Sequence, residues 1–564
     1  MKRILFLLVS ALNPSRPDLR VKIVRSVLFR FYRNPVGKLF YRILLSFLYP
    51  IWLSIKNNRN IASYLYAEDQ KTDINGKDIG VIIVFSGRND REGRHICLDL
   101  QKQNILFSGI YLVFPPEMPM KRMQEIACHF QTFQNVHICS GSEDIEQPGN
   151  AEPFTGIVMD AQTFLHKDGV KVFIRSLEHQ DTEMVYGDED RRSCFGIKTD
   201  PFFKPDYSPL LARNTNYMGS CAALKIRHKE LPAILARLNI LQDVSCFLTE
   251  RAEACQRNAI AHAPFILTSS KKHILPLHRK CNDHPDSEHF PLVSLIIPTR
   301  NGIDILKTCI DSILNCTSYP KDRYNIIIVN NNSDEQGTLD YLKEGQENSI
   351  FTVIDDPSPF NYSQLNNKAV AQSQAEVIVF LNNDTEIIQH DWLDRLTEQA
   401  LQPGIGAVGA KLLYPDRTVQ HAGILLGILN TAIHLDIGIS RNAPGSCGFA
   451  LLDREVSAVT GACLAMRKDV FLEIGQFNTD LAVAFNDVLL CLEALKHGYR
   501  NVVLNTVELI HHESKSRGRA KTLADYEREQ KELDFCRAQA EMYFRLDPCY
   551  NLNCSPTIPY FLKF

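Results

Sequence analysis

The chain has 564 residues, of which 45% are hydrophobic and 23% are charged, and its formal net charge at pH 7 is −3. A chain of this length is too long for one hydrophobic core, so we expect two or three domains. The composition is that of a globular protein and excludes a low-complexity chain. The small net charge gives no sign of a nucleic-acid partner, and none is expected.

The first part of the chain, residues 1–66, is basic and rich in large apolar side chains, with twelve Lys or Arg residues and one acid, Asp18. Its charge-free stretch, residues 43–55, is too short to cross about 30 Å of hydrocarbon. The pattern predicts an amphipathic arm that binds an anionic membrane surface. A basic helical arm packed on the rest of the protein is the alternative. The start MKRILFLLVSAL resembles a signal peptide, but NPSRPDLR follows in place of a cleavage site, so we expect it to be retained.

Strand-like runs alternate with helical runs in two long stretches of the chain, separated by the polar, His-rich residues 271–290. This alternation predicts βαβ units and mostly parallel sheets, and hence an α/β protein. The expected parts are an arm over residues 1–76, a first domain over 77–275, a second over 290–520, and a helix and tail over 521–564.

Sixteen Cys residues are scattered along the chain without a C-x-x-C pair or the spacing of a structural zinc site. Cys463 and Cys491 lie in apolar runs. Buried free thiols in a reducing cytoplasm are therefore expected.

The two halves look like copies of each other. GIVMDAQTFLHKDGV (156–170) has the rhythm of VIVFLNNDTEIIQHDWL (377–393), roughly 220 residues later. LQDVSCFLTERAEA (241–254) likewise matches FNDVLLCLEALKHG (485–498). The repeat predicts two domains of one fold.

The strand VIVFL (377–381) runs directly into the polar residues NNDTE. Asn, Asp and Thr are ordinary turn formers, so a plain turn is one interpretation. The carboxyl end of a parallel strand is also where open α/β sheets bind ligands. There Asp384 could bind a Mg²⁺ or Mn²⁺ ion that in turn holds a diphosphate.

Four other segments carry polar groups that could belong to a site. IIPTRNG (296–302) and IIIVNNNSDE (326–335) end strands, where turn chemistry alone explains them equally well. Asp487 begins a helix, where a carboxylate also favours the helix dipole. His511, His512 and Arg517 in ELIHHESKSRG can supply a metal ligand and a diphosphate clamp.

In this order, PTRNG, VNNNSDE, FNYSQLNNKA, LNNDTE, FNDVLLCLEALKHGYR and HHESKSRG closely resemble family 2 glycosyltransferases, and most of all the bacterial enzymes of O-antigen and capsule assembly, rhamnosyltransferases included. The resemblance covers about residues 290–520 and implies the Rossmann-like GT-A fold. It places NND at the family's Asp-x-Asp motif, with Asn382 as a neutral helper. Leu489 and Glu493 depart from the family pattern, which commonly has Asp and Arg there.

The resemblance also implies roles for individual residues. Asp487 falls on the catalytic base. Asp384, His511 and His512 are the expected ligands of Mn²⁺ or Mg²⁺. The donor nucleotide-sugar is expected at Pro298, Thr299, Arg300, Asn301, Asn330, Asn331, Asn366, Lys368, Asn383 and Arg517, and the acceptor at Thr460, Gly461, Ala462 and Asn486.

The first half resembles a degenerate copy of the second. Its triplet, residues 160–162, reads DAQ and lacks the last acid. Asp243 matches the acid at the helix start, and residues 188–190 (DED) with 201–209 resemble a stretch of two-domain family members. This half is expected to be a scaffold or an acceptor-binding domain.

The resemblance implies an inverting enzyme that moves a sugar from dTDP-rhamnose or a UDP-sugar to a hydroxyl of a lipid-linked or growing cell-surface glycan. Its acceptor would be a glycan or a polyprenyl-linked sugar, on the inner face of the cytoplasmic membrane. A non-catalytic scaffold that binds a sugar nucleotide is the alternative. A processive synthase is disfavoured, because a Gln-x-x-Arg-Trp motif is absent and the two Trp residues are Trp52 and Trp392.

Overall fold

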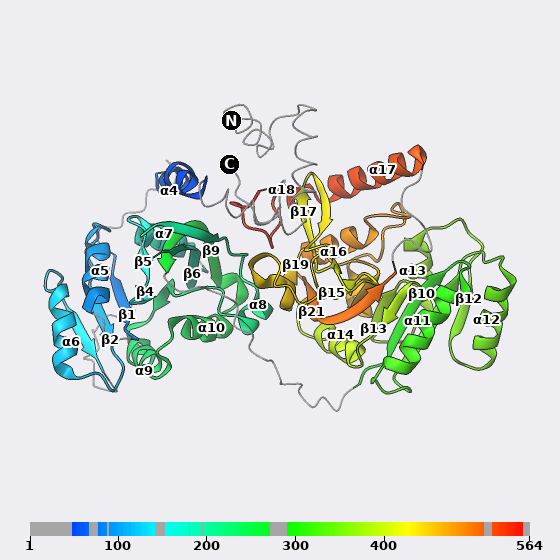
Figure 1. Ribbon diagram of the computed structural model, residues 1–564, viewed down its shortest axis with the longest axis horizontal. Coiled ribbons are helices and arrows are strands. Elements are labelled where there is room, and N and C mark those ends of the chain that lie inside the picture. Colours follow the sequence, from blue (N-terminus) through cyan, green and yellow to red (C-terminus); the bar gives the residue numbers. More distant parts are fainter. Residues whose placement is uncertain are drawn as a thin grey trace. The chain divides into compact units, whose positions relative to one another are not determined.

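The structure is a computed structural model, which describes residues 48–66, 77–86, 90–140, 153–179, 181–193, 196–270, 290–512 and 522–555. These residues form two compact units, which are coloured blue to green and green to red in Figure 1. The first unit contains residues 48–270 together with residues 551–555, and the second contains residues 290–550. The end of the chain therefore belongs to the first unit.

The first unit is built on a nine-stranded mixed sheet. The strands follow the order β3 (Val136–Cys139), β2 (Gly109–Val113), β1 (Ile79–Val84), β4 (Phe154–Asp160), β8 (Cys221–Ile226), β6 (Met184–Arg192), β9 (Ile260–Ser270) and β5 (Phe164–Leu165), and β7 (Lys198–Phe202) pairs with β6. Its α-helices after the amino-terminal segment are α5 (Asp90–Gln101), α6 (Met120–Ala127), α7 (Gly169–Leu177), α8 (Pro209–Asn214), α9 (Leu231–Leu241) and α10 (Val244–Ala254).

The second unit is built on a ten-stranded mixed sheet. The order is β12 (Thr352–Asp355), β11 (Tyr324–Asn330), β10 (Val293–Thr299), β13 (Val377–Leu381), β20 (Cys463–Arg467), β15 (Ile405–Leu413), β21 (Arg500–His511) and β14 (Thr385–Ile387), with β16 (Val419–His421) on β15 and β19 (Arg454–Val456) on β21. β17 (Ile424–Ile428) and β18 (Thr431–His434) form a hairpin. Its α-helices are α11 (Ile303–Cys316), α12 (Gln336–Glu347), α13 (Tyr362–Gln372), α14 (Trp392–Ala400), α15 (Lys468–Glu473), α16 (Asn486–Lys496), α17 (Leu523–Gln539) and α18 (Glu541–Arg545).

The two sheets share one topology. In each, four parallel strands at one edge, β3-β2-β1-β4 or β12-β11-β10-β13, are followed by an antiparallel strand, β8 or β20. The next strands, β6 and β9 or β15 and β21, pair in parallel, and a short antiparallel strand follows. The predicted α/β class and the predicted repeat of one fold are both confirmed.

The buried strands explain the hydrophobic runs of the sequence. All five residues of β13, VIVFL, are buried, because strands inside a parallel sheet are covered on both faces. Cys463 on β20 and Cys491 on α16 are fully buried free thiols, as expected from their apolar surroundings.

The described part of the predicted arm packs on the first unit. A π-helical turn, η1 (Leu53–Asn57), leads into α4 (Asn58–Leu65). Trp52 is 2% exposed and meets Phe203 edge to face, and Asn57 exchanges hydrogen bonds with the backbone of Ile266. Residues 48–65 therefore follow the alternative interpretation, in which the arm packs on the rest of the protein. Among the described helices, none has the length and apolar content that a membrane crossing requires.

Candidate active site

A pocket of about 330 Å³ lies at the carboxyl ends of β10, β11 and β13. The sheet order reverses at β10, which has β11 on one side and β13 on the other, and open α/β sheets bind ligands at such a point. Asn383 Nδ2 donates to Thr299 Oγ1 at 2.9 Å and joins two of these strand ends. Five residues predicted to bind the donor line the pocket: Pro298, Thr299, Arg300, Asn331 and Asn383.

The polar residues after β13 form both a turn and a wall of this pocket. Thr385 donates from its backbone N and from Oγ1 to Asn382 O, at 3.2 and 2.8 Å, which closes the turn. Asn382 and Asn383 line the pocket. The segment therefore forms a turn that also lines a pocket, and the binding of a ligand or metal there stays a prediction.

Asp384, the residue after these two Asn residues, faces His511. β14 pairs with the end of β21 so that Thr385 lies opposite His511, and Asp384 Oδ1 comes within 3.0 Å of His511 Nε2. Asp384 is only 4% exposed. The two side chains, 127 positions apart in the sequence, thus meet beside the pocket.

The hydrogen bonds of His511 fix which ring nitrogen faces the carboxylate. Gln420 Nε2 donates to the His511 carbonyl oxygen, so Gln420 Oε1 must accept from His511 Nδ1, at 2.7 Å. Nε2 then faces the Asp384 carboxylate, and Asn382 Nδ2 lies 3.4 Å from the same nitrogen. A proton or a cation between Nε2 and the carboxylate would make this contact favourable. A His residue that binds a metal through one ring nitrogen typically donates a hydrogen bond from the other, as His511 Nδ1 does here.

The donor set at Asp384 and His511 fits a divalent cation. Among the described residues, no group of three or more His, Cys, Asp or Glu side chains is arranged to hold a metal ion. Carboxylates suit Mg²⁺ and Mn²⁺, which are commonly held by one or two protein carboxylates and by phosphate oxygens. One carboxylate and one imidazole would leave room for such oxygens.

His512 takes a different direction from His511. Its Nε2 lies 2.9 Å from Glu386 Oε2, and its backbone N donates to Asp384 O. Side chains alternate along an extended segment, so neighbouring residues point to opposite sides. Of the two His residues predicted to bind metal, His511 is the one brought to Asp384.

Asp487 lies at the start of α16. Its Oδ2 accepts a hydrogen bond from Gly461 N at 2.7 Å, and Oδ1 accepts from Val488 N at 2.8 Å. The residue before α16, Phe485, has a φ of 58°, a left-handed conformation that is costly for a bulky residue. Asn486 is buried, and its Nδ2 has no hydrogen-bond partner among the described residues.

The predicted acceptor loop, Thr460 to Ala462, connects Asp487 with the pocket. Gly461 donates its N–H to Asp487, and its carbonyl accepts from Tyr362 Oη at 2.9 Å. Ala462 O accepts from Asn382 N at 3.1 Å. Both Tyr362 and Asn382 line the pocket, so Asp487, the loop and the pocket form one hydrogen-bonded assembly.

Four other residues predicted to bind the donor have partners within the protein. Asn301 Oδ1 accepts from the backbone N of Asp334 and of Glu335, and Asn330 Nδ2 donates to Asp355 Oδ1. Asn366 is fully buried and donates to Tyr362 O, and Lys368 pairs with Asp356 at 3.0 Å. Asn366 thus bonds within its own helix, α13, and the other three contact neighbouring strand ends and loops. Arg517 lies outside the described residues.

Comparison with known proteins decides the family. The family model Glycosyl transferase family 2 matches residues 294–475, which contain Asp384 and nine of the eleven residues that line the pocket. Residues 294–475 are a family 2 glycosyltransferase domain. The uncharacterised protein y4gI of Sinorhizobium fredii is 32% identical over 440 residues, which are 70% of this chain and 48% of that protein.

Two further similar proteins have descriptive names. The O-antigen biosynthesis protein RfbC of Myxococcus xanthus is 31% identical over 64% of this chain and 31% of its own length. The chain thus spans half or less of these two relatives. Among solved structures, the mannosyltransferase PcManGT of Pyrobaculum calidifontis, in complex with GDP-Man and Mn²⁺, is 18% identical, with a TM-score of 0.34 over 46% of this chain and 72% of its own.

Six residues of the second unit line the pocket or contact His511, although no role is predicted for them from the sequence. Phe360, Tyr362 and Leu365 lie in the segment FNYSQLNNKA, which belongs to the resemblance, although no role is predicted for them. Gln420 likewise lies in GAVGAKLLYPDRTVQHAGI (406–424), which also belongs to the resemblance, without a predicted role. Val483 and Arg528 carry no local sequence signal, because their contacts depend on how distant segments fold back.

The first unit has apolar residues where the glycosyltransferase domain has its pocket. With Asp160 aligned on Asn382, the strand registers put Phe85 at the place of Thr299 and Phe114 at the place of Asn330. The two Phe rings are fully buried and stack at 4.8 Å between centroids. Asn239 of α9 donates to Phe114 O at 2.7 Å and covers this strand end.

The pair formed by Asp384 and His511 is replaced in the first unit as well. The same alignment puts Gln162 at the place of Asp384. The pairing of β5 with β9 puts Ser270 at the place of His511. Neither residue offers the carboxylate or the imidazole of the second unit.

Proposed function

We propose that this chain is an inverting glycosyltransferase that moves a sugar from a nucleotide-diphosphate sugar to a hydroxyl group of a glycan. The observation that carries the proposal is the meeting of Asp384 with His511 beside the pocket, with Asp487 joined to that pocket through Gly461. The described residues that we propose for the donor, the metal and the base thus all belong to the second unit.

In the proposed reaction Asp487 acts as the general base. Its carboxylate takes the proton of the acceptor hydroxyl, whose oxygen forms a bond to the anomeric carbon from the face opposite the leaving group. The bond from that carbon to the diphosphate oxygen breaks, the nucleoside diphosphate leaves with the electron pair, and the configuration inverts. Mn²⁺ or Mg²⁺ held by Asp384 and His511 would neutralise charge on the leaving diphosphate.

The donor is dTDP-rhamnose or a UDP-sugar in this proposal, and the acceptor is a lipid-linked or growing cell-surface glycan. The names of two similar proteins support this class: the O-antigen biosynthesis protein RfbC, and the O-antigen chain rhamnosyltransferase RfbN of Salmonella typhimurium, which is 24% identical over 37% of this chain. The first unit is proposed as a scaffold or acceptor-binding domain. Phe85 and Phe114 at the places of Thr299 and Asn330 support that role.

We expect the purified chain to release nucleoside diphosphate from one member of a panel of nucleotide-sugars in the presence of Mn²⁺, and not in EDTA. Asp384→Asn should lower this release by roughly a hundredfold or more, because metal charge stabilisation is worth several kcal/mol. Asp416→Asn is the control, since Asp416 is exposed and forms a turn with Thr418. Nucleotide binding without turnover of any donor would favour the non-catalytic scaffold, the rival function.

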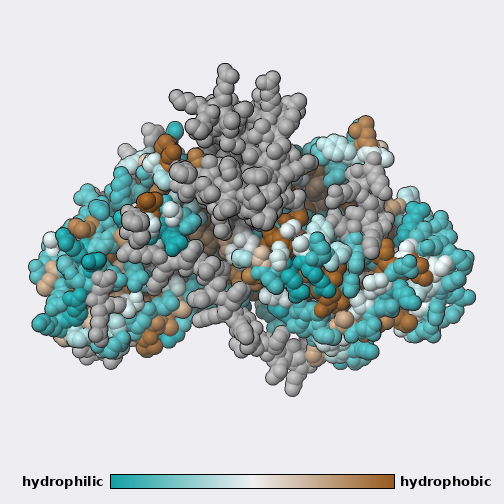
Figure 2. Space-filling view, viewed as in Figure 1, coloured by the Kyte–Doolittle hydropathy of each residue, from teal (hydrophilic) through white to brown (hydrophobic). Residues whose placement is uncertain are grey.

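We also propose that the basic amino-terminal segment holds the protein on the inner face of the cytoplasmic membrane. Hydrophilic residues cover most of the described surface in Figure 2, yet Ile51 and Ile55 are 54% and 64% exposed near basic Lys56 and Arg59. Apolar side chains beside basic ones suit an anionic lipid surface.

Deleting residues 1–47 removes most of the basic residues of the segment and keeps the buried Tyr49 and Trp52. We expect the shortened chain to lose co-sedimentation with vesicles that contain phosphatidylglycerol, because each basic residue near the surface contributes about 1 kcal/mol. Vesicles of phosphatidylcholine alone are the control. Unchanged sedimentation with the anionic vesicles would refute the membrane role.

A further inference from the structure

Helix α17 lies outside the residues matched by the family model, and the sequence predicts it only as a carboxyl-terminal helix. In Figure 1 it is the long red helix of the second unit, next to α16. Thr522 caps it by accepting from Asp525 N, and its Leu533 and Cys536 are buried in the second unit. The helix is therefore a fixed part of this unit.

One buried carboxylate of α17 holds a loop of the active site. Glu532 is 7% exposed, and its Oε1 accepts from the backbone N of Ala482 and Val483 at 3.1 and 3.2 Å. Its Oε2 accepts from Ala484 N at 2.7 Å. Hydrogen bonds to an ionised acceptor are about twice as strong as neutral ones. Three successive backbone N–H groups thus depend on this single side chain.

The loop that Glu532 holds leads directly into Asp487. Its last residue is Phe485, whose left-handed conformation persists only where the surroundings enforce it. On the other side of the loop, Tyr362 N donates to Ala482 O at 2.9 Å. Glu532 and α13 therefore fix the loop from two sides and set the start of α16, where Asp487 lies.

The same face of α17 reaches the donor pocket one turn earlier. Arg528 precedes Glu532 by four residues, so the two side chains lie on one side of the helix. Arg528 lines the pocket with Arg300 and Val483, and the described lining contains no carboxylate. Its ion pair with Asp525, at 3.1 Å, is exposed and therefore weak. The pocket lining thus contains two Arg residues, which suits an anionic ligand.

We propose that α17 is part of the donor site and couples it to the catalytic base. Arg528 binds the diphosphate of the nucleotide, and Glu532 is a positioning residue that holds Val483 against the nucleotide and Asp487 toward the acceptor. This inference rests on the proposed function, because it assigns α17 to the same donor site and the same base.

The role of Arg528 is tested by titrating the full chain with UDP and with dTDP in MnCl₂, by calorimetry. We expect Arg528→Gln to weaken binding of the preferred nucleotide by about tenfold or more, since a hydrogen bond to a charged group is worth about 1.5–3 kcal/mol. Arg537→Gln, on the same helix and paired with Asp534, is the matched control. Equal affinities of the two variants would overturn the role of Arg528.

The role of Glu532 is tested by separating turnover from binding. Glu532→Gln keeps the side-chain shape but has one acceptor oxygen in place of two, so kcat should fall about tenfold or more as Asp487 shifts, with the Kd for nucleotide changed by less than about threefold. Hydrogen exchange at residues 482–484 should become faster. Glu529→Gln, exposed on the same helix, is the control.

The outcomes distinguish this inference from the proposed function. A wild-type chain that binds neither nucleotide and releases none from any donor refutes the function, and the assignment of α17 with it. A wild-type chain that turns over while Glu532→Gln keeps its kcat refutes only the positioning role. A fall in kcat matched by an equal loss of nucleotide binding and of thermal stability would mean general destabilisation, and would also overturn that role.

Discussion

Asp487→Asn is expected to lower kcat by about two to four orders of magnitude, which is the usual contribution of a general base. Asn has nearly the shape of Asp, and its one acceptor oxygen keeps one of the two hydrogen bonds that Asp487 accepts from Gly461 N and Val488 N. The acceptor hydroxyl, however, loses the group that takes its proton. The fold and the affinity for nucleotide should therefore stay close to those of the wild type.

A matched control exists at the start of α15. Asp469 accepts from Val470 N at 2.7 Å, as Asp487 accepts from Val488 N, but its side chain is 71% exposed and lies outside the pocket lining. Asp469→Asn should keep full activity. Steady-state release of nucleoside diphosphate at saturating donor and acceptor measures both variants. If Asp487→Asn turns over as fast as Asp469→Asn, Asp487 is not the base.

The parts of the fold that could be predicted are those with local signals. The strand VIVFL is predicted from five apolar residues in a row, and its burial on both faces follows from a parallel sheet. The repeat is visible because a strand followed by a polar triplet occurs twice, at residues 160–162 and 382–384. Each of these signals is contained in a few consecutive residues, so reading it requires no knowledge of contacts between distant segments.

The pocket could be predicted in part for a related reason. Thr299, Asn331 and Asn383 follow three strands whose carboxyl ends meet at one edge, so their proximity follows from topology. The turn chemistry of Asn301 and Asn330 uses the same residue types, and composition cannot separate side chains that face a ligand from those that hold a loop.

Contacts between distant segments account for what the sequence did not reveal. Glu532 meets a loop 48 to 50 residues before it, and Tyr49 donates to Asp190 across 141 residues. A basic amphipathic segment has the same composition whether its apolar side meets lipid or protein. The composition therefore does not show which of the two the segment binds. In the structure, residues 48–65 pack on the first unit.

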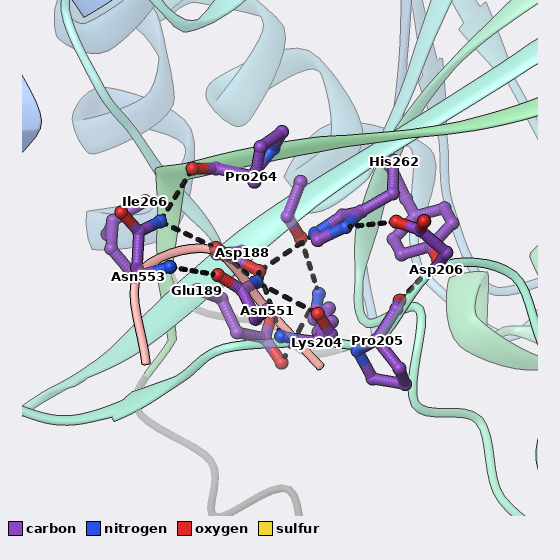
Figure 3. Close-up of polar contacts among 12 residues, drawn as sticks. Asp188, Glu189, Lys204, Pro205, Asp206, His262, Pro264, Ile266, Asn551 and Asn553 are labelled. Atoms are coloured by element: carbon purple, nitrogen blue, oxygen red, sulfur yellow. Dashed lines mark hydrogen bonds and ion pairs between the residues drawn. The ribbon is translucent and has the colours of Figure 1, made fainter. Parts of the chain in front are cut away.

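The largest stability effect is expected in the first unit, at the buried cluster in Figure 3. Asp188 is fully buried and accepts hydrogen bonds from Lys204 N, from His262 Nε2 and from Asn551 Nδ2, each at 2.9 Å. Asn551 comes from the end of the chain and also donates to Lys204 O at 2.8 Å. Removing one member leaves the others buried without their partner.

His262 is the titrating member of this cluster. Burial alone would lower its pKa, but the carboxylates of Asp188 and Asp206 on either side of the ring raise the pKa to about 9. Tyr186 stacks on the imidazole at 5.0 Å. The unfolded pKa is about 6.5, so the ionised pair contributes its full stability below pH 6.5 and loses it as the pH rises through 9.

His262→Gln should therefore lower the free energy of unfolding of the first unit at pH 6.5 by about 3–5 kcal/mol, the cost of breaking a buried ion pair. It should also remove the decline of stability between pH 6.5 and pH 9. The chain has two Trp residues, Trp52 in the first unit and Trp392 in the second. In a Trp392→Phe background, urea unfolding followed by Trp52 fluorescence reports on the first unit alone.

His179→Gln is the control for this experiment, because His179 is exposed and belongs to the same unit. The Trp52 transition of this control should keep the wild-type pH dependence, since the Asp188–His262 pair remains intact. If His262→Gln instead shows the same decline toward pH 9 as His179→Gln, another group titrates there. Asp188 would then hold the end of the chain through the amide of Asn551 and not through an imidazolium ion.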